Sequence, residues 1–270
     1  MKATVLIDNK SDGCLVSEWG LAIYIEHNGV GVLLDTGSTG DFIINAAAIK
    51  ADIQNAEYCV LSHAHYDHAD GLDSFFAIND KARLYIREGA KENCYLKTGR
   101  RYKYDGIRRG TLKKYAGRIE YVSGISEIAH GVFLVPHSTE SLQLIGRQAM
   151  LYRRKGLRFF PDDFAHEQSL VIETEKGLCI FSSCSHAGAD NIIKEVTAAF
   201  PDKHIDLFMG GMHLFNSSDD EVRAFAKRVR DTGIEHICTG HCTGDRAFEI
   251  LKEELGDKAE QFSSGYTIEV

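Results

Sequence analysis

Three histidines and one aspartate lie within six residues in the first third of the chain. The run follows the apolar segment Tyr58–Ser62 and reads His63-Ala64-His65-Tyr66-Asp67-His68. Side chains alternate in an extended segment, so His63 and His65 project to the same side and can bind one cation. Asp67 and His68 follow after the chain begins to turn, so we expect them to serve a second cation nearby. Metal coordination uses the imidazole lone pairs and neutralises the carboxylate charge, which gives this crowding a chemical purpose.

Length, composition and charge limit the classes of protein that could carry such a site. The chain has 270 residues, of which 44% are hydrophobic, and this suits one sizeable α/β domain. A formal net charge of −8 argues against a surface that coats nucleic acid. No apolar run reaches the roughly 20 residues of a membrane span, and the N-terminus turns acidic at Asp8, too early for a secretory signal. We therefore expect a single domain in the cytoplasm, with neither nucleic acid nor membrane as a partner.

The seven cysteines are an odd number and show no disulfide-like spacing. Cys59 and Cys179 lie inside apolar, strand-like runs, where cysteine is usually a small buried hydrophobic residue. Cys184, Cys238 and Cys242 lie beside candidate metal histidines, and zinc accepts thiolate ligands. Ordinary burial is the preferred interpretation for all of them, and metal coordination by one of the last three is the alternative.

Strands and helices that would position the histidines alternate along the chain. Two hairpins are predicted, Leu21–Glu26 with Val30–Leu34 and Ser169–Glu173 with Leu178–Ser182, and each ends in a polar loop. This repetition suggests a duplicated β-rich half. Helical spacing occurs at Phe42–Ile49, Asp190–Phe200 and Glu221–Asp231, and further short strands are predicted at Ile205–Met209 and Ile234–Thr239. The interleaving predicts a layered α/β architecture.

One basic segment, Lys81–Arg118, departs from the acidic composition of the rest. It holds thirteen lysines or arginines against three acids, together with five tyrosines. It is either a solvated, partly helical insertion centred near residues 88–118, or a basic flap over a site that binds anions. In a flap, arginines would grip phosphate oxygens and tyrosines would stack on a planar ring. The candidates for this substrate-binding role are Arg100, Arg101, Tyr102, Arg108 and Arg109.

The histidine run resembles the HxHxDH signature of the metallo-β-lactamase superfamily. That resemblance implies a four-layer αβ/βα sandwich with a dinuclear metal site along one edge of its two sheets. Leu34–Gly37 resembles the strand end that places an aspartate behind the first histidines, so Asp35 is expected to orient a ligand histidine. His166 opens a segment where the family has its third histidine on the first metal. His241 follows a late strand, where the family has the last histidine on the second metal.

The chain departs from the superfamily pattern at one expected ligand. A bridging aspartate usually ends the strand after the third histidine, but Ser183-Cys184-Ser185-His186 stands there. A serine hydroxyl replaces a bridging carboxylate poorly, and a neutral imidazole does not bridge two cations as a carboxylate does. His186 is expected to complete whichever site lacks the aspartate. We therefore expect one of the two metals to be held more weakly.

Three segments narrow the resemblance to the branch labelled after the archaeal 7,8-dihydropterin-6-methyl-4-(β-D-ribofuranosyl)aminobenzene-5′-phosphate synthase. They are Cys184–Gly188, Gly210–Leu214 and Thr239–Gly244, and Leu6–Asn9 and Glu18–Ala22 agree. Membership of a branch does not fix the substrate. His213 follows two glycines that let a ligand approach closely, so it is expected to face the substrate.

The resemblance implies a metal-dependent hydrolase that uses hydroxide held by two divalent transition metals. Zinc is the default for histidine-rich sites, and iron and manganese are alternatives. Asp67 is expected to accept the proton of the attacking water, and the substrate to be a small, phosphate-containing anion, pterin-like or nucleotide-like. Two alternatives are a metal-containing protein that binds a small ligand without turnover, which the missing aspartate suggests, and a di-iron redox protein.

Overall fold

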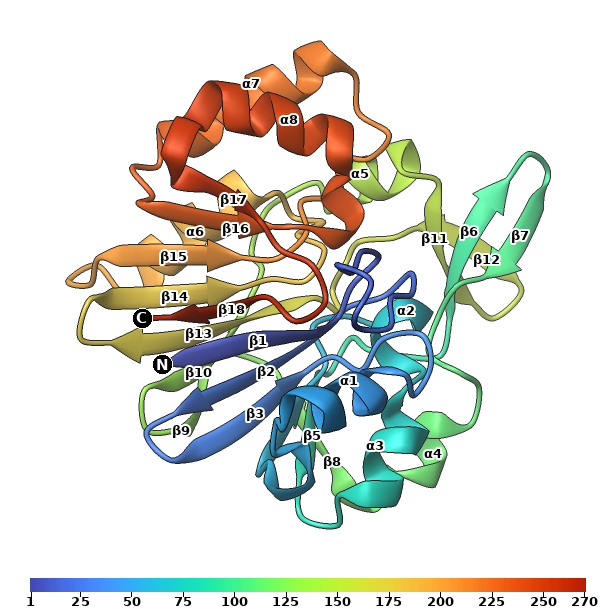
Figure 1. Cartoon of the computed structure of the whole chain (residues 1–270). Helices are drawn as coiled ribbons and strands as arrows, with labels where there is room; N and C mark the ends of the chain where they lie inside the picture. Colours follow the sequence, from blue (N-terminus) through green and yellow to red (C-terminus); the bar gives the residue numbers. More distant parts are fainter.

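The computed structural model describes residues 1–270, and two seven-stranded sheets lie face to face at its centre (Figure 1). The first sheet has the order β18 (Thr267–Glu269), β1 (Lys2–Ile7), β2 (Ala22–His27), β3 (Val30–Leu34), β4 (Tyr58–Val60), β5 (Arg83–Arg87), β8 (Ile119–Val122). The second has the order β17 (Ala259–Gln261), β16 (His236–Thr239), β15 (Ile205–Met209), β14 (Gly177–Phe181), β13 (Gln168–Thr174), β10 (Val132–Pro136), β9 (Ser126–Ala129). The C-terminal β18 leaves the second half of the chain and pairs with β1 of the first sheet.

Helices cover the outer face of each sheet. The first sheet carries α1 (Phe42–Ile49), α3 (Leu72–Ile78) and α4 (Thr111–Lys114), and the second carries α6 (Ala189–Ala199), α7 (Asp219–Arg230) and α8 (Asp245–Leu255) (Figure 1). The remaining helices are α2 (Tyr66–Ala69), α5 (Leu142–Gln148) and the single 3₁₀ turns Ile53–Asn55, Ala116–Arg118, His241–Thr243 and Gly256–Lys258. None of the helices combines the length and the apolar character that a membrane crossing requires.

Alternation along the strands produces three apolar cores between four layers. In β2, Ile23 and Ile25 face the core between the two sheets, whereas Ala22 and Tyr24 face the core beneath α1 and α3. A third core lies between the second sheet and α6, α7 and α8. The αβ/βα sandwich expected from the sequence is therefore confirmed, and both predicted hairpins are present as β2–β3 and β13–β14.

The basic segment Lys81–Arg118 is mainly extended, and only its C-terminal part is helical. Its central part forms a hairpin of β6 (Cys94–Thr98) and β7 (Arg101–Tyr104), and α4 follows as a single short helix. β6 pairs with β11 (Leu151–Lys155), which pairs with β12 (Arg158–Pro161), so two segments far apart in sequence build a separate four-stranded sheet. The β6–β7 hairpin projects from the side of the sandwich (Figure 1).

The direction of the strands brings the polar loops together. β3, β4 and β5 are parallel in the first sheet, and β14, β15 and β16 are parallel in the second. The carboxyl ends of parallel strands meet at the same edge of a sheet. The loops after β3, β4, β14, β15 and β16, which carry the candidate residues, are therefore delivered to neighbouring positions.

Candidate metal centre

Several residues of the candidate site have a left-handed backbone conformation that residues other than glycine seldom adopt. Asp35, Ser185, His213 and His241 have φ angles of 59°, 52°, 49° and 49°. Each such residue costs about 1–3 kcal/mol and persists because the surrounding structure holds it. Four of the nine non-glycine residues with positive φ thus lie in the loops at this edge, where the fold turns side chains toward a common point.

A first group of converging side chains consists of His63, His65 and His186, whose candidate ligand atoms lie within 4.8 Å of one another. The Nε2 atoms of His63 and His65 and both ring nitrogens of His186 are buried and have no hydrogen-bond partner. Burial, reinforced by the neighbouring imidazoles, holds the pKa of all three rings well below the usual value. These rings are therefore neutral, and they aim unpaired lone pairs at one another.

The position of His186 is fixed by contacts to its ring and its backbone. The backbone N–H groups of His186 and Ala187 donate to the two carboxylate oxygens of Glu167, at 2.9 and 3.1 Å. The His186 ring stacks on Phe164 with a centroid distance of 4.4 Å and an interplanar angle of 5°. Glu167 and Phe164 lie between β12 and β13, so this segment positions His186 on the loop after β14.

A second group consists of Asp67, His68 and His241, again within 4.8 Å. Asp67 Oδ2 lies 3.7 Å from His68 Nε2 and 3.6 Å from His241 Nε2. Burial holds the pKa of His241 well below its usual value. Its Nδ1 contacts Asn9 Oδ1 at 3.0 Å, whereas its buried Nε2 has no hydrogen-bond partner. Burial alone would also lower the pKa of His68, but the carboxylates of Asp67 and Asp35 outweigh it and raise that pKa to about 9.

One buried carboxylate, Asp35, orients a histidine in each group. His68 Nδ1 donates to Asp35 Oδ2 at 2.8 Å. The Ser62 hydroxyl donates to the same oxygen at 2.6 Å and faces His63 Nδ1 at 2.8 Å, while the Ser62 backbone N–H donates to Asp35 Oδ1 at 2.7 Å. Because Nδ1 of His68 faces Asp35 and Nδ1 of His63 faces the Ser62 hydroxyl, the Nε2 atom of each ring points away from Asp35, toward the converging donors.

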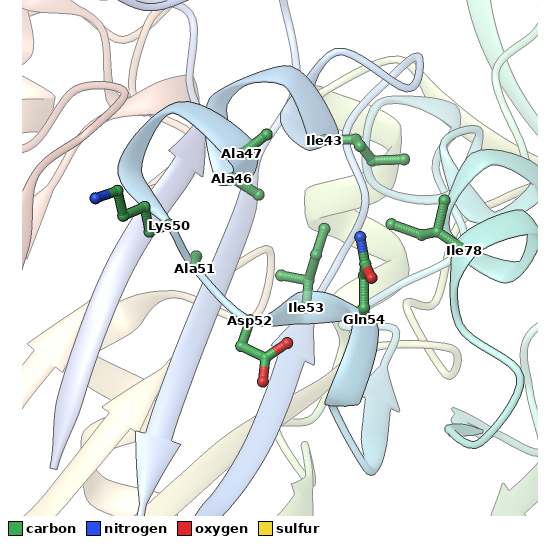
Figure 2. Close-up of a pocket in the computed structure, with 9 residues that line it drawn as sticks. All are labelled: Ile43, Ala46, Ala47, Lys50, Ala51, Asp52, Ile53, Gln54 and Ile78. Atoms are coloured by element: carbon green, nitrogen blue, oxygen red, sulfur yellow. The ribbon is translucent and has the colours of Figure 1, made fainter.

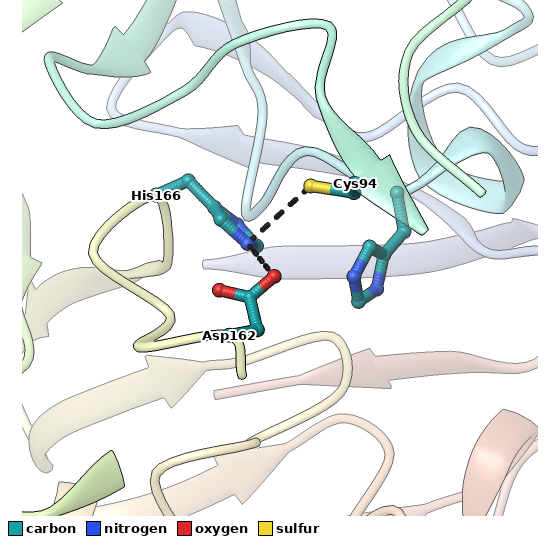
Figure 3. A group of neighbouring side chains, drawn as sticks. Cys94, Asp162 and His166 are labelled. Atoms are coloured by element: carbon teal, nitrogen blue, oxygen red, sulfur yellow. Dashed lines mark hydrogen bonds and ion pairs between the residues drawn. The ribbon is translucent and has the colours of Figure 1, made fainter. Parts of the chain in front are cut away.

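His166 lies beside this centre and contacts Ala64, Asp162 and Cys94 (Figure 3). Its Nδ1 accepts a hydrogen bond from the backbone N–H of Ala64 at 3.1 Å, and its Nε2 lies 3.2 Å from Asp162 Oδ2 and 3.7 Å from Cys94 Sγ. An Nδ1 that accepts leaves the ring hydrogen on Nε2, facing Asp162. Both nitrogens of His166 are thus engaged. His186 shares a donor group with both His63 and His65, whereas His166 shares one with His65, Cys94 and Asp162, so the expected role of His166 on the first metal stays a prediction.

Sequence reasoning missed Cys94 and Asp162. Their ligand-type atoms and those of His65 and His166 lie within 4.8 Å of one another, and both missed side chains are buried. Neither belongs to a motif: Cys94 begins β6, and Asp162 directly follows β12. The only signal was the position of Asp162 four residues before His166, which fits many local structures.

Two cysteines reach the centre. Cys184 Sγ lies 3.3 Å from His68 Nε2 and 3.4 Å from Cys242 Sγ, which accepts a hydrogen bond from the backbone N–H of His213 at 3.2 Å. The His213 ring packs beside His186, with centroids 4.5 Å apart, and its Nδ1 is buried without a partner. Cys238, by contrast, lies in the apolar core between the sheets.

The five candidate substrate-binding residues of the basic segment lie in different places. Arg108 and Arg109 line a cavity of about 390 Å³ together with Tyr66, the residue before Asp67. Arg100 and Arg101 are exposed at the β6–β7 turn, on the part that projects from the sandwich (Figure 1). Tyr102 stacks on Phe159 of β12 with a centroid distance of 3.9 Å. Only the first pair therefore lies at a cavity that adjoins the loop of Asp67.

Another hollow, of about 350 Å³, lies between α1 and the loop that follows it (Figure 2). Its lining is mainly aliphatic, with Ile43, Ile53 and Ile78 among its residues. It lies in the outer helix layer and shares no residue with the two histidine groups. Its charged groups, Lys50 and Asp52, do not form a constellation that could carry chemistry.

The model of the metallo-β-lactamase superfamily matches residues 20–174 of the sequence. The chain belongs to this superfamily. A protein of Methanocaldococcus jannaschii named 7,8-dihydropterin-6-methyl-4-(β-D-ribofuranosyl)-aminobenzene-5′-phosphate synthase is 28% identical over 267 residues, which cover 93% of this chain and 90% of the relative. The resemblance to this superfamily and this branch is thus confirmed.

Solved structures agree with the fold. Tm1679, described as a metal-dependent hydrolase of the β-lactamase superfamily, superposes with a TM-score of 0.83 at 31% identity, covering 100% of this chain and 99% of that protein. YhfI from Bacillus subtilis, a metallo-β-lactamase fold protein, gives a TM-score of 0.59 at 11% identity, covering 99% and 98% of the two chains. The second likeness concerns the fold alone.

Proposed function

We propose that the chain is a metal-dependent hydrolase that holds two divalent transition metals and acts on a small, phosphate-containing anion. The observation that carries this proposal is the convergence of two donor triads at one edge of the sheets. Four histidines in these triads have buried nitrogens without partners: His63, His65, His186 and His241. A buried polar atom left unpaired costs about 1–3 kcal/mol, which cation binding would offset. The residues therefore fit the metals that the superfamily implies.

Each triad would hold one cation. His63, His65 and His186 suit the first, and Asp67, His68 and His241 suit the second, with zinc as the default and iron or manganese as alternatives. When bound, two such cations supply the Lewis acidity that polarises the bond under attack and makes water more acidic. Asp67 is the one carboxylate in the triads, and its Oδ2 faces His68 and His241. Its other oxygen is left to accept a proton from the attacking water.

The anionic substrate is supported by the cavity beside Asp67. Lys103, Arg108 and Arg109 line it with Tyr66, Tyr104 and one acid, Asp70, so three cations face a single carboxylate. Arg108 lies 4.0 Å from Asp70, and Arg109 packs over the Tyr104 ring. Guanidinium groups bind phosphate oxygens in pairs, and tyrosines stack on planar rings such as a pterin or a nucleobase. The relative from Methanocaldococcus jannaschii is named after a dihydropterin ribosyl phosphate, which has both features. That name also supports a second candidate function, a synthase of the same kind.

The test begins with metal analysis of the full chain, followed by a substrate panel. We expect about two transition-metal ions per chain, one held more weakly, and hydrolysis within a panel of phosphoesters, lactones and thioesters. Formation of the compound named for the relative is assayed in parallel. His65→Ala and Asp67→Ala should abolish hydrolysis with an unchanged circular dichroism spectrum, because neither residue belongs to an apolar core.

Three outcomes would contradict the proposal in different ways. A chain that binds no zinc, iron or manganese on anaerobic reconstitution has no metal centre at all. A chain that binds two metals and ligands without turnover is a small-ligand-binding protein. A chain that binds iron and exchanges electrons instead of hydrolysing esters is a redox protein.

A further inference from the structure

The loop after β14 places one further donor between the two triads. Cys184 Sγ lies within 4.8 Å of the ligand atoms of both His63 and His68. His63 belongs to the first triad and His68 to the second. Cys184 is also hydrogen-bonded to His68 Nε2 at 3.3 Å, the atom that faces Asp67. We propose that Cys184 bridges the two metals as a thiolate, at the position where the superfamily usually has an aspartate; this rests on the proposed dinuclear site.

The other residues of the same loop do not contact donors of both triads. The Ser185 hydroxyl donates to Gly211 O at 2.7 Å and lies 3.2 Å from Ser182 O, so it faces the loop backbone. His186 belongs to the first triad and is held there by Phe164 and Glu167. Ser183 belongs to none of the metal-type donor groups. Cys184 alone in this loop reaches donors of both triads.

Cys242 supports Cys184 without taking its place. Its Sγ lies 3.4 Å from Cys184 Sγ and shares a donor group only with Cys184 and His213. A hydrogen bond from the Cys242 thiol would stabilise a thiolate at Cys184, as contacts behind metal ligands commonly do. Gly211 makes room for this sulfur, since a Cβ there would lie 2.5 Å from Cys242 Sγ. Cys242 is therefore a matched control, a buried neighbouring thiol that does not bridge.

A thiolate bridge has a chemical consequence for the choice of metal. Thiolates favour zinc, iron and cobalt, whereas carboxylates and water suit magnesium, calcium and manganese. A chain that bridges with sulfur should thus discriminate against manganese, magnesium and calcium. The thiol proton passes to solvent when the metals bind, since a cysteine ligand must be deprotonated.

The experiment is an anaerobic titration of the metal-free full chain with cobalt(II), in the presence of a reductant that does not bind metal. Cobalt bound to a thiolate shows a sulfur-to-metal charge-transfer band in the near ultraviolet. For the wild type we expect this band to grow over both equivalents of cobalt, because the sulfur contacts both ions. Cys184→Ser should lose the band and bind at least one ion at least about tenfold more weakly. Cys242→Ser should keep the band.

Cys184→Asp restores a carboxylate at the bridging position, so it should bind two cobalt ions without the band. This variant also keeps the test valid if Cys184→Ser folds poorly. A band that persists in Cys184→Ser, or is lost equally in Cys242→Ser, would overturn the bridge. So would a wild-type band that grows over one equivalent only, because Cys184 would then bind a single ion. A band of the expected form without any hydrolysis would leave the bridge standing and refute the hydrolase.

Discussion

Replacing Asp35 with asparagine should weaken both metals at once. The carboxylate accepts from His68 Nδ1 directly and, through the Ser62 hydroxyl, is linked to His63 Nδ1. One of these histidines belongs to each triad. Asparagine tolerates the left-handed backbone that Asp35 has at φ 59°, so Asp35→Asn removes the charge with little change of shape.

The size of the effect follows from the contacts. Loss of a partner behind a metal-binding histidine typically costs 10–100-fold in affinity, about 1.4–2.7 kcal/mol for each metal. Two metals together then lose about 3–5 kcal/mol of metal-linked stability. At roughly 2 °C for each kcal/mol in a chain of this size, the rise in Tm on adding metal should shrink by roughly 5–10 °C.

Ser62→Ala separates the two branches of the network. It breaks the link to His63 but leaves the contact between His68 and Asp35, so only the first metal should weaken. The double variant Ser62→Ala with Asp35→Asn should bind the first metal no more weakly than Asp35→Asn alone, because Ser62 acts through Asp35. The assay is titration of the metal-free variants against a chromophoric chelator. The reasoning is refuted if Asp35→Asn weakens one metal only, or if Ser62→Ala weakens the second.

Two further predictions concern the neighbours of the centre. His186→Ala should reduce the metal content to about one ion per chain. His166→Ala should keep two ions and weaken binding of the first metal about 10–100-fold, because His166 positions the Ala64 backbone. The measurement is elemental analysis, and the opposite pattern would make His166 the ligand. Charge reversal at the cavity, Arg108→Glu with Arg109→Glu, should raise KM selectively for an anionic ester, and this rise should shrink with added salt. Reversal at the hairpin tip, Arg100→Glu with Arg101→Glu, should not raise it. Equal effects on a matched neutral ester would mean that the cavity pair only shapes the site.

The sequence by itself predicted the features that depend on local sequence patterns. Apolar runs joined by turns that contain glycine, His27-Asn28-Gly29 and Glu175-Lys176-Gly177, identified both hairpins. The short run from His63 to His68 predicted two sets of donors, since extended residues alternate and the following turn redirects the chain. Both inferences need only neighbours in the sequence.

The tertiary structure decided which loops meet. His166 precedes β13 and His186 follows β14, so both lie at the open end of this hairpin, and nothing local says which ring faces His63 and His65. Stacking on Phe164 and the bonds to Glu167 place His186 there, while Ala64 and Asp162 engage His166.

The positions of the basic segment and of the cysteines also depend on contacts between residues far apart in the sequence. Pairing of β6 with β11 joins residues more than fifty positions apart, and it sends Arg100 to an exposed tip while Arg108 lines a cavity. Cys184 reaches donors of both triads because the first sheet delivers His63 and His68 and the second delivers the loop after β14 to the same edge. Such contacts depend on how two sheets pack, and packing is set by the shape of the whole core rather than by the spacing of residues along the chain.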